Sequence, residues 1–456
     1  MLGTNPGSVV GARSRRSWWL LALIFVVVSV GGLRLLGDRA VASEGQNDRL
    51  GVALDDEEKD HRKAESKLKK ALASGNLEHI AYYLEIVGRR PTRTVLKRIL
   101  AIGAEFPGEP VRTSVRRVLA NADDPDAIEF LGKELVKTKR PQHAILIVEA
   151  LEQIPHEATI VPLANALRKH RDKKILIEIA TALRYKPSKE SVDALIDFFK
   201  KVEGDQDKLW AETLISLRTL TGHDYEVYDD WANWWLPARQ TWKPVDDHQA
   251  EEKAISGVYR PKRGRRLDLP EMFGQEIPSK RVAFVIDTSK SMLERDERTA
   301  EEGAGGAGKT RLERAQAELI KAIGALRKDV KFGVIAYNTH IISFDDSDLV
   351  PATRKNKTRA MEFVRGWQAE GTTNTGKAML AALALDGVDT IILLSDGSPT
   401  DPETGKVVDV EPIIEAITED NRFKRVTIHT LGFPGAKVSF MRALARLNHG
   451  TYANVK

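Results

Sequence analysis

The sequence predicts a multidomain chain: an α-helical solenoid over residues 61–236, then an α/β domain with a mainly parallel central sheet over residues 281–456. Three observations predict this. Leucines recur every 32 residues in the first part, as in stacked helical repeats. Strand-like apolar runs alternate with amphipathic helices in the second part, which is typical of a parallel sheet covered on both faces. Oxygen-bearing side chains follow two of those strands, where open α/β sheets place their sites.

Composition narrows the functional classes. The 456 residues include 70 basic and 65 acidic ones, a net charge of +5, and no cysteine. The length allows two or three domains. The near-balanced charge gives no support to a nucleic-acid binder. The lack of cysteine excludes disulfides, thiolate metal sites and cysteine nucleophiles.

Residues 1–42 are predicted to be a signal peptide or a membrane anchor. Three arginines precede the apolar run Trp18–Val30, and Ala40-Val41-Ala42 offers a small-x-small cleavage site. As an uncleaved anchor, Trp18–Leu36 would span about 28 Å, just enough for a bilayer core. The charge order favours a cytoplasmic N-terminus, so both interpretations predict export: periplasmic, secreted or membrane-anchored. A buried core helix is the alternative. Residues 43–60 are polar and predicted to be a tether.

The helical part, residues 61–236, carries a 32-residue period. Two leucine series follow it, and prolines punctuate the blocks at similar spacing. Two helices per unit of this length is the signature of an α-solenoid, with a plain helical bundle as the alternative. The region resembles HEAT-like repeats, although its units are short for that family. The residues of the two series are Leu119, Leu151 and Leu183, and Leu131, Leu163 and Leu195.

Two segments follow the repeats. Trp231, Trp234 and Trp235 can share one helix face, and we expect them to cap the stack rather than to form a ligand platform. Residues 237–280 are predicted to be a basic linker, in which Arg260–Arg266 holds five cations in seven residues. Such a run could contact phosphate or lipid head groups, but a solvated linker is the simpler interpretation.

The α/β part is predicted from alternating patterns. We expect strands at 282–286, 330–337, 340–344, 390–394, 426–431 and 451–455. We expect helices at 311–326, 354–367, 375–385, 412–418 and 438–447. Strands that alternate with helices in this way form a Rossmann-like layered sheet.

Three short motifs lie at the ends of these elements. Asp287-Thr288-Ser289-Lys290-Ser291 follows the first buried strand, where its carboxylate and two hydroxyls suit a hard cation such as Mg²⁺ or Mn²⁺. Alone, this pentad could be only a strand end with a helix cap. The loop Gly371–Gly376 precedes a helix, and Leu393-Leu394-Ser395-Asp396-Gly397 ends a strand in a second carboxylate.

These three motifs, in this order, resemble the von Willebrand factor type A (VWA) domain from residue 281 onward. The resemblance implies a metal-ion-dependent adhesion site (MIDAS). Ser289, Ser291 and Thr373 would correspond to its hydroxyl ligands, and Asp287 and Asp396 to carboxylates that reach the ion through water. Carboxylates that reach the ion only through water neutralise its charge only in part. The ion therefore stays electrophilic and can bind an acidic oxygen from a protein partner.

A competing motif lies between the first strand and the next helix. Gly303–Thr310 satisfies the spelling of a P-loop, which would make the protein an NTPase. A P-loop must follow a strand directly so that its amides hold phosphate at the helix N-terminus. The preceding stretch Leu293–Glu302 is charged and has no strand character, so we interpret the motif as a flexible insertion beside the metal site.

The sequence therefore predicts an exported, adhesion-type binding protein and not an enzyme. Its VWA domain would use Mg²⁺ or Mn²⁺ to hold an Asp or Glu of a protein ligand. The membrane would be a partner only if the N-terminal segment stays uncleaved, and no nucleic acid is expected. A structural scaffold whose metal site is unused is the alternative.

Overall fold

The computed structural model describes residues 44–155, 157–205, 207–244, 269–295, 309–345 and 348–455, with side chains from residue 58 onward. The predicted signal or anchor segment, the basic run Arg260–Arg266 and most of the P-loop-like motif lie outside these residues. In the described part of the chain, no helix is both long and apolar enough to cross a membrane. Residues Lys59–Lys456 form one compact unit.

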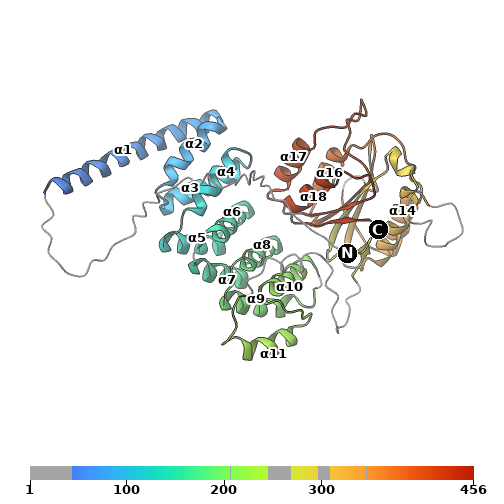
Figure 1. Ribbon diagram of the computed structural model, residues 1–456, viewed down its shortest axis with the longest axis horizontal. Helices are drawn as coiled ribbons and strands as arrows, with labels where there is room; N and C mark the ends of the chain where they lie inside the picture. Colours follow the sequence, from blue (N-terminus) through green and yellow to red (C-terminus); the bar gives the residue numbers. More distant parts are fainter. Residues whose placement is uncertain are drawn as a thin grey trace, which may run out of the picture. The chain divides into compact units, whose positions relative to one another are not determined.

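The first part of the described chain is entirely helical (Figure 1). Its first helix, α1, begins within the segment assigned above to a polar tether. The helices are α1 (Glu44–Ser74), α2 (Leu77–Gly88), α3 (Arg93–Glu105), α4 (Val111–Ala120), α5 (Pro125–Lys137), α6 (Pro141–Gln153), α7 (Ile160–Lys169), α8 (Lys173–Arg184), α9 (Lys189–Val202), α10 (Lys208–Thr221) and α11 (Tyr228–Ala238), with a short 3₁₀ turn, η1 (Glu157–Thr159).

These helices stack in two layers. From α2 to α10 each even-numbered helix packs on the next even-numbered one, and α5, α7, α9 and α11 pack in the same way. Several polar bonds join residues 32 positions apart, such as Arg117 Nη1 to Glu85 Oε1 at 2.7 Å and Lys173 Nζ to Asp205 Oδ2 at 3.1 Å. The period seen in the sequence is therefore a spatial repeat, because each unit bonds to the same position of the next. Assignment to HEAT-like repeats stays a prediction.

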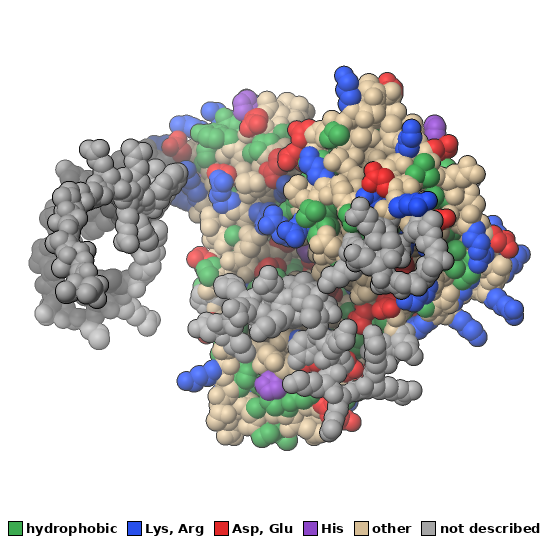
Figure 2. Space-filling view, turned by 45° about the vertical axis from the view of Figure 1, so that its right-hand side comes forward, with side chains coloured by type: hydrophobic (Ala, Val, Ile, Leu, Met, Phe, Trp, Pro, Cys, Tyr) green, Lys and Arg blue, Asp and Glu red, His purple; other side chains and the backbone are tan. Residues whose placement is uncertain are grey.

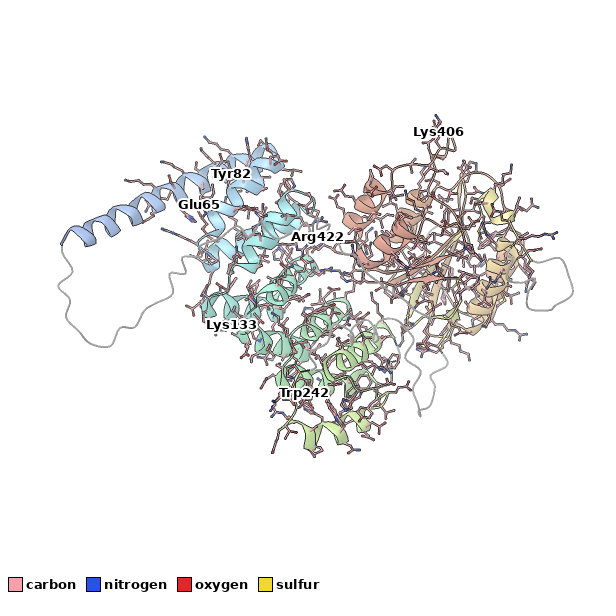
Figure 3. The ribbon with its side chains drawn as sticks, viewed as in Figure 1. Glu65, Tyr82, Lys133, Trp242, Lys406 and Arg422 are labelled. Carbon is pink, nitrogen blue, oxygen red and sulfur yellow. The ribbon has the colours of Figure 1, made fainter. Side chains whose placement is uncertain are left out.

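The tryptophan cluster closes this helical region. Trp231 and Trp235 of α11 are buried in the same core as the repeats. The indole N–H of Trp235 donates to Asp193 Oδ1 at 2.7 Å, which ties α11 to α9. Trp242 continues the cluster beyond the helix, with its ring 5.5 Å from that of Trp235 (Figure 3). This packing is that of a cap on the stack.

The second part is a twisted sheet with helices on both faces (Figure 1). Strand order is β5-β4-β3-β7-β8-β9, with β6 beside β4; β3, β4, β7, β8 and β9 run parallel, and β5 and β6 are antiparallel to β4. The strands are β3 (Arg281–Asp287), β4 (Lys331–Tyr337), β5 (Ile341–Ser343), β6 (Val350–Pro351), β7 (Thr390–Ser395), β8 (Thr427–Gly432) and β9 (Tyr452–Asn454). A separate hairpin, β1 (Glu271–Met272) and β2 (Gln275–Glu276), precedes the sheet within the predicted linker.

Alternate residues of each central strand face opposite layers. Val282, Phe284 and Ile286 of β3 pack into one core with α14 and α15, whereas Ala283 and Val285 pack into the other with α16, α17 and α18. Both faces are buried, which explains why the strands are continuous apolar runs. The helices are α14 (Arg311–Ala325), α15 (Arg354–Arg365), α16 (Thr375–Leu383), α17 (Glu411–Asn421) and α18 (Val438–Leu447); η2 (Lys290–Leu293) is a 3₁₀ turn.

The helical region contacts the edge of the sheet at which β7 and β8 begin. Lys208 Nζ of α10 donates to the backbone oxygens of Asp389 and Arg425, at 3.2 and 3.1 Å, just before those strands. The Arg425 guanidinium pairs with Glu149 of α6 at 2.5 Å and lies 3.5 Å from Glu178 of α8. Arg422, at the end of α17, donates to the Pro107 carbonyl at 3.3 Å (Figure 3). This edge is thus covered by the chain itself.

Surface charge is mixed in sign. On the face shown in Figure 2, Lys and Arg side chains are interspersed with Asp and Glu. This distribution is what the near-balanced count of 70 basic and 65 acidic residues predicts.

Candidate metal centre

The site forms at the opposite edge of the sheet, where β3 and β7 end side by side. Chain order reverses between these strands, because β3 leads to β4 on one side and β7 leads to β8 on the other. Loops diverge at such a switch point and leave a crevice at the carboxyl ends of the strands. Asp287 is the last residue of β3, and Asp396 directly follows β7. The fold therefore brings together two carboxylates that lie 109 positions apart in the sequence.

Backbone bonds hold the surrounding loops in place. The Thr288 N–H donates to the Tyr337 carbonyl at 2.8 Å, and the Lys290 N–H donates to the Gly371 carbonyl at 3.3 Å. Gly371 has φ +71°, and a Cβ there would lie 2.5 Å from Thr339 Oγ1, so only glycine fits. The loops after β3 and β4 and the loop before α16 are thus one rigid platform.

The predicted hydroxyl ligands lie close to one another. Ser289 Oγ and Ser291 Oγ are 3.1 Å apart, and Ser291 donates to Asp396 Oδ1 at 2.7 Å. Thr373 comes from the loop before α16, where its N–H donates to the Thr400 hydroxyl at 2.7 Å. A Cβ placed on Gly397 would lie 3.8 Å from both Ser291 Oγ and Thr373 Oγ1. The missing side chain of Gly397 leaves open the space that these two hydroxyls face.

Both carboxylates are buried and already bonded. Asp287 Oδ1 accepts from the Ser289 N–H at 2.8 Å, and Oδ2 accepts from the Ser395 hydroxyl at 2.7 Å. Asp396 accepts from Ser291 at Oδ1 and from Arg311 at Oδ2. Carboxylates engaged in this way suit an outer role, in which they orient ligands and waters while hydroxyls contact the ion.

The two acids carry one more negative charge than Arg311 compensates. Burial, and then the nearby negative charge of Asp396, raise the pKa of Asp287 from 3.8 to about 6. Burial also raises the pKa of Asp396, although the Ser291 hydroxyl and the Arg311 guanidinium oppose that rise. Two like charges held together away from water favour either a proton or a cation between them. A divalent ion would relieve this cost.

The donors present fit a hard cation. Hydroxyl and carboxylate oxygens are the ligands that Mg²⁺ and Mn²⁺ prefer. Within the described ranges, no group of three or more His, Cys, Asp or Glu residues is placed to hold a metal, so an ion here would depend on the hydroxyls. Ser289, Ser291 and Thr373 would hold it, with Asp287 and Asp396 behind them. Their role as ligands stays a prediction.

Several residues at the site were not singled out by the sequence. Ser395 and Thr400 bond Asp287 and Thr373, but serine and threonine are too common near strand ends to be informative. Arg311 offered a better signal. It is the first residue of α14, and a cation at a helix N-terminus is unfavourable. Such a residue is expected to have a specific acidic partner, and here the partner is Asp396, at 2.9 Å.

The P-loop interpretation receives no geometric support from the residues described. Thr310 is the N-cap of α14 and forms a capping box with Glu313. Its backbone pairs with Arg295 in an isolated bridge, so the insertion begins and ends at one place. Among the described residues, the strand that precedes α14 is β3, which ends at Asp287 and leads directly into Thr288–Ser291. The described part of the chain therefore shows no strand that leads directly into Lys309–Thr310.

Comparison with known proteins agrees with this topology. Residues 282–398 match the model of a family described as von Willebrand factor type A domain. The chain is 33% identical over 185 residues to human inter-alpha-trypsin inhibitor heavy chain H4, covering 38% of this chain and 18% of that protein. The bovine H4 chain is 30% identical over 185 residues, with the same coverage. The chain thus spans less than a fifth of the length of these relatives. A VWA domain with a mostly parallel sheet forms its C-terminal part.

Two solved structures are similar to part of this chain, at low identity and low TM-score. A von Willebrand factor type A protein from Catenulispora acidiphila is 20% identical, with a TM-score of 0.32, and covers 40% of each chain. A mussel byssus protein, proximal thread matrix protein 1, was solved with a zinc-occupied MIDAS motif. It is 18% identical, with a TM-score of 0.27, and covers 38% of this chain and 41% of that chain.

Proposed function

We propose that this protein is an extracytoplasmic binding protein that captures a protein ligand through a divalent metal ion at the VWA site. The observation that carries the proposal is the open space beside Gly397. Hydroxyls of Ser291 and Thr373 face that space, and two buried, mutually repelling carboxylates lie behind. An ion there would be neutralised only in part and would attract an acidic oxygen from outside the chain. The ligand would therefore offer an Asp or Glu carboxylate.

Metal binding is the first test. The full chain is titrated with Mn²⁺, and the electron paramagnetic resonance signal of free Mn²⁺ is recorded. The titration should show one saturable site, for which Mg²⁺ competes. Thr373→Ala removes a direct oxygen and should weaken binding at least about tenfold. Thr372→Ala is the matched control, because the Thr372 hydroxyl bonds Thr339 instead, at 3.1 Å. Equal binding by both variants and the parent would contradict the assigned ligand set.

Ligand capture is the second test. Immobilised full chain should retain a protein from envelope material in Mg²⁺ or Mn²⁺ and release it in EDTA. Blocking the carboxylates of that protein by amidation should abolish retention. Capture that survives both EDTA and Asp287→Ala would favour the alternative function, a scaffold whose metal site is unused. Retention that needs the metal but not the carboxylates would limit the proposal to metal binding.

We propose that the protein is not an enzyme. The NTPase alternative depends on Lys309, which begins the described segment before α14. Lys309→Ala should leave Mn²⁺ binding unchanged, and ATP with Mg²⁺ should not protect the parent chain from thermal unfolding. Protection by ATP that Lys309→Ala abolishes would revive the NTPase function.

Export is part of the proposal and is supported by the arginines and the apolar run within residues 1–42. A tagged chain should fractionate with the envelope or the exterior, and deletion of residues 1–42 should leave it in the cytoplasm. The same distribution with and without this segment would contradict export.

A further inference from the structure

We propose that Arg311 is a built-in counter-cation of the metal centre, which weakens metal binding and makes it depend on an incoming carboxylate. This inference rests on the proposed function, because it concerns the same ion. Arg311 would act through charge and through Asp396, without contact with the ion.

The guanidinium is held between two acids. Its Nη1 donates to Asp396 Oδ2 at 2.9 Å, and its Nη2 lies 2.7 Å from Glu294 Oε2. The Arg311 side chain is 11% exposed and that of Asp396 is fully buried, whereas Glu294 is 63% exposed. Solvent therefore screens the bond to Glu294, and the pair with Asp396 dominates.

The surroundings fix the guanidinium at this place. The Arg311 N–H donates to the Glu294 carbonyl at 2.9 Å, and the capping box of Thr310 sets the start of α14. Gly435 packs against the pair: its φ is +101°, and a Cβ there would lie 3.0 Å from the Asp396 carbonyl and 3.8 Å from Arg311 Nη1. The close backbone of Gly435 limits the room in which the guanidinium could move away from Asp396.

The pair of Arg311 and Asp396 changes the net charge of the metal centre. Asp287 and Asp396 alone would match a divalent ion and leave it neutral. With Arg311 paired to Asp396, the empty centre carries one net negative charge and the loaded centre one net positive charge. A carboxylate from a ligand would return the loaded centre to neutrality. Ion and ligand should thus bind cooperatively, since each supplies the charge that the other lacks.

A simpler role predicts the opposite effect. If Arg311 only positioned Asp396, removing it would disorder the carboxylate and weaken metal binding about 10–100-fold, as loss of an outer partner commonly does. If Arg311 opposes the ion by charge, removing it should strengthen binding instead. Ser291 still bonds Asp396 from the other side, so the carboxylate keeps one anchor in the variant. The sign of the change decides between the two roles.

The experiment measures the Mn²⁺ affinity of the full chain from the electron paramagnetic resonance signal of free Mn²⁺. Arg311→Met removes the charge at similar length and should tighten Mn²⁺ binding on the order of tenfold. Arg311→Lys keeps the charge and should stay near the parent. Lys321→Met is the matched control, because Lys321 lies on the same helix but is 61% exposed and pairs with Glu271; it should change nothing. Circular dichroism confirms that each variant is folded.

A second arm tests the cooperativity with acetate as the probe carboxylate, at constant ionic strength against chloride. Acetate should tighten Mn²⁺ binding to the parent and to Arg311→Lys, and should have less effect on Arg311→Met. Weaker or unchanged Mn²⁺ binding by Arg311→Met would overturn the counter-cation role while the proposed function stands. Absence of saturable Mn²⁺ binding by the parent and by all variants would overturn the proposed function, and this inference with it.

Discussion

The two edges of the VWA sheet differ in the balance between buried acidic and basic side chains. At the edge where β7 and β8 begin, two guanidinium groups, those of Arg422 and Arg425, meet two acids of the helical region, Glu149 and Glu178. At the edge where β3 and β7 end, two buried acids, Asp287 and Asp396, share one cation, Arg311. The first edge is compensated within the chain, and the second is left with an excess of negative charge. The difference supports the proposal that the second edge binds a cation.

Breaking the compensated edge should have the largest effect. Arg425→Met leaves Glu178 without its cation and Glu149 with only Arg422, 3.6 Å away. It should lower the free energy of unfolding by about 3 kcal/mol, near the lower bound for a broken buried ion pair, because both acids keep some exposure and Glu149 keeps one partner. Urea denaturation of the full chain measures this. Lys424→Met in the same loop removes only an exposed pair with Asp420 and should cost less than about 1 kcal/mol. Equal losses would show that the contact contributes little.

Relieving the uncompensated edge should stabilise the metal-free protein. The pKa of Asp287 is raised from 3.8 to about 6, so the folded state holds this proton more tightly than the unfolded state. In EDTA, stability should therefore fall as pH rises from about 4 to about 6, by about 3 kcal/mol in total. Asp287→Asn should flatten this slope and be the more stable protein at pH 7.5. Urea denaturation of the parent and of Asp287→Asn across that pH range checks both predictions. If the stability of the parent did not fall as the pH rises, the excess of negative charge at this edge would be refuted.

The compensated edge should respond to acid in the reverse direction. Burial, and then the cation of Lys208, lower the pKa of His429 on β8 from 6.5 to about 4. The folded state thus binds this proton less well, and stability should fall as pH drops from about 6.5 to about 4. The effect should be smaller than that of Asp287, because His429 keeps part of its surface exposed. Melting temperatures of Asp287→Asn and of the double variant Asp287→Asn/His429→Gln, measured across this pH range, isolate the contribution of His429. The same dependence of melting temperature on pH in both variants would contradict the prediction.

The smallest stability change should accompany a large loss of binding. Gly397→Ala places a methyl group 3.8 Å from Ser291 Oγ and Thr373 Oγ1, an ordinary contact in the space where we propose that the ion binds. Stability should change by no more than about 0.5 kcal/mol, while Mn²⁺ binding should fall at least about tenfold. Gly324→Ala within α14 is the control and should keep full binding. Normal binding by Gly397→Ala would show that the ion lies elsewhere.

Much of this fold was predictable because the sheet is buried on both faces. Strands such as 282–286 and 390–394 are uninterrupted apolar runs, and the structure has β3 and β7 there, each a residue or two longer. The two-residue strands β1, β2 and β6 could not be predicted, because so short a segment carries no periodicity. The helical period was visible since each unit bonds to the same position of the next.

The remaining parts depend on contacts that sequence patterns do not record. No pattern in the sequence distinguishes Arg422 and Arg425 from ordinary surface residues, and only the fold shows that they meet Pro107 and Glu149. The motifs brought Asp287 and Asp396 into one prediction, but the pairing of Arg311 with Asp396 needs a helix start and a strand end to meet in space. Local rules explain each segment separately and cannot place one beside another.

The placement of the two edges also has a mechanical consequence. Lys208 of the helical region donates hydrogen bonds to the backbone just before β7 and β8. The candidate site lies at the other end, where β3 and β7 end. Tension between a captured partner and the helical region would run along these parallel strands. Their backbone hydrogen bonds lie across that direction, so many of them would be loaded together in shear instead of being opened one at a time. If the proposed capture takes place, the sheet would therefore resist that tension along its strands.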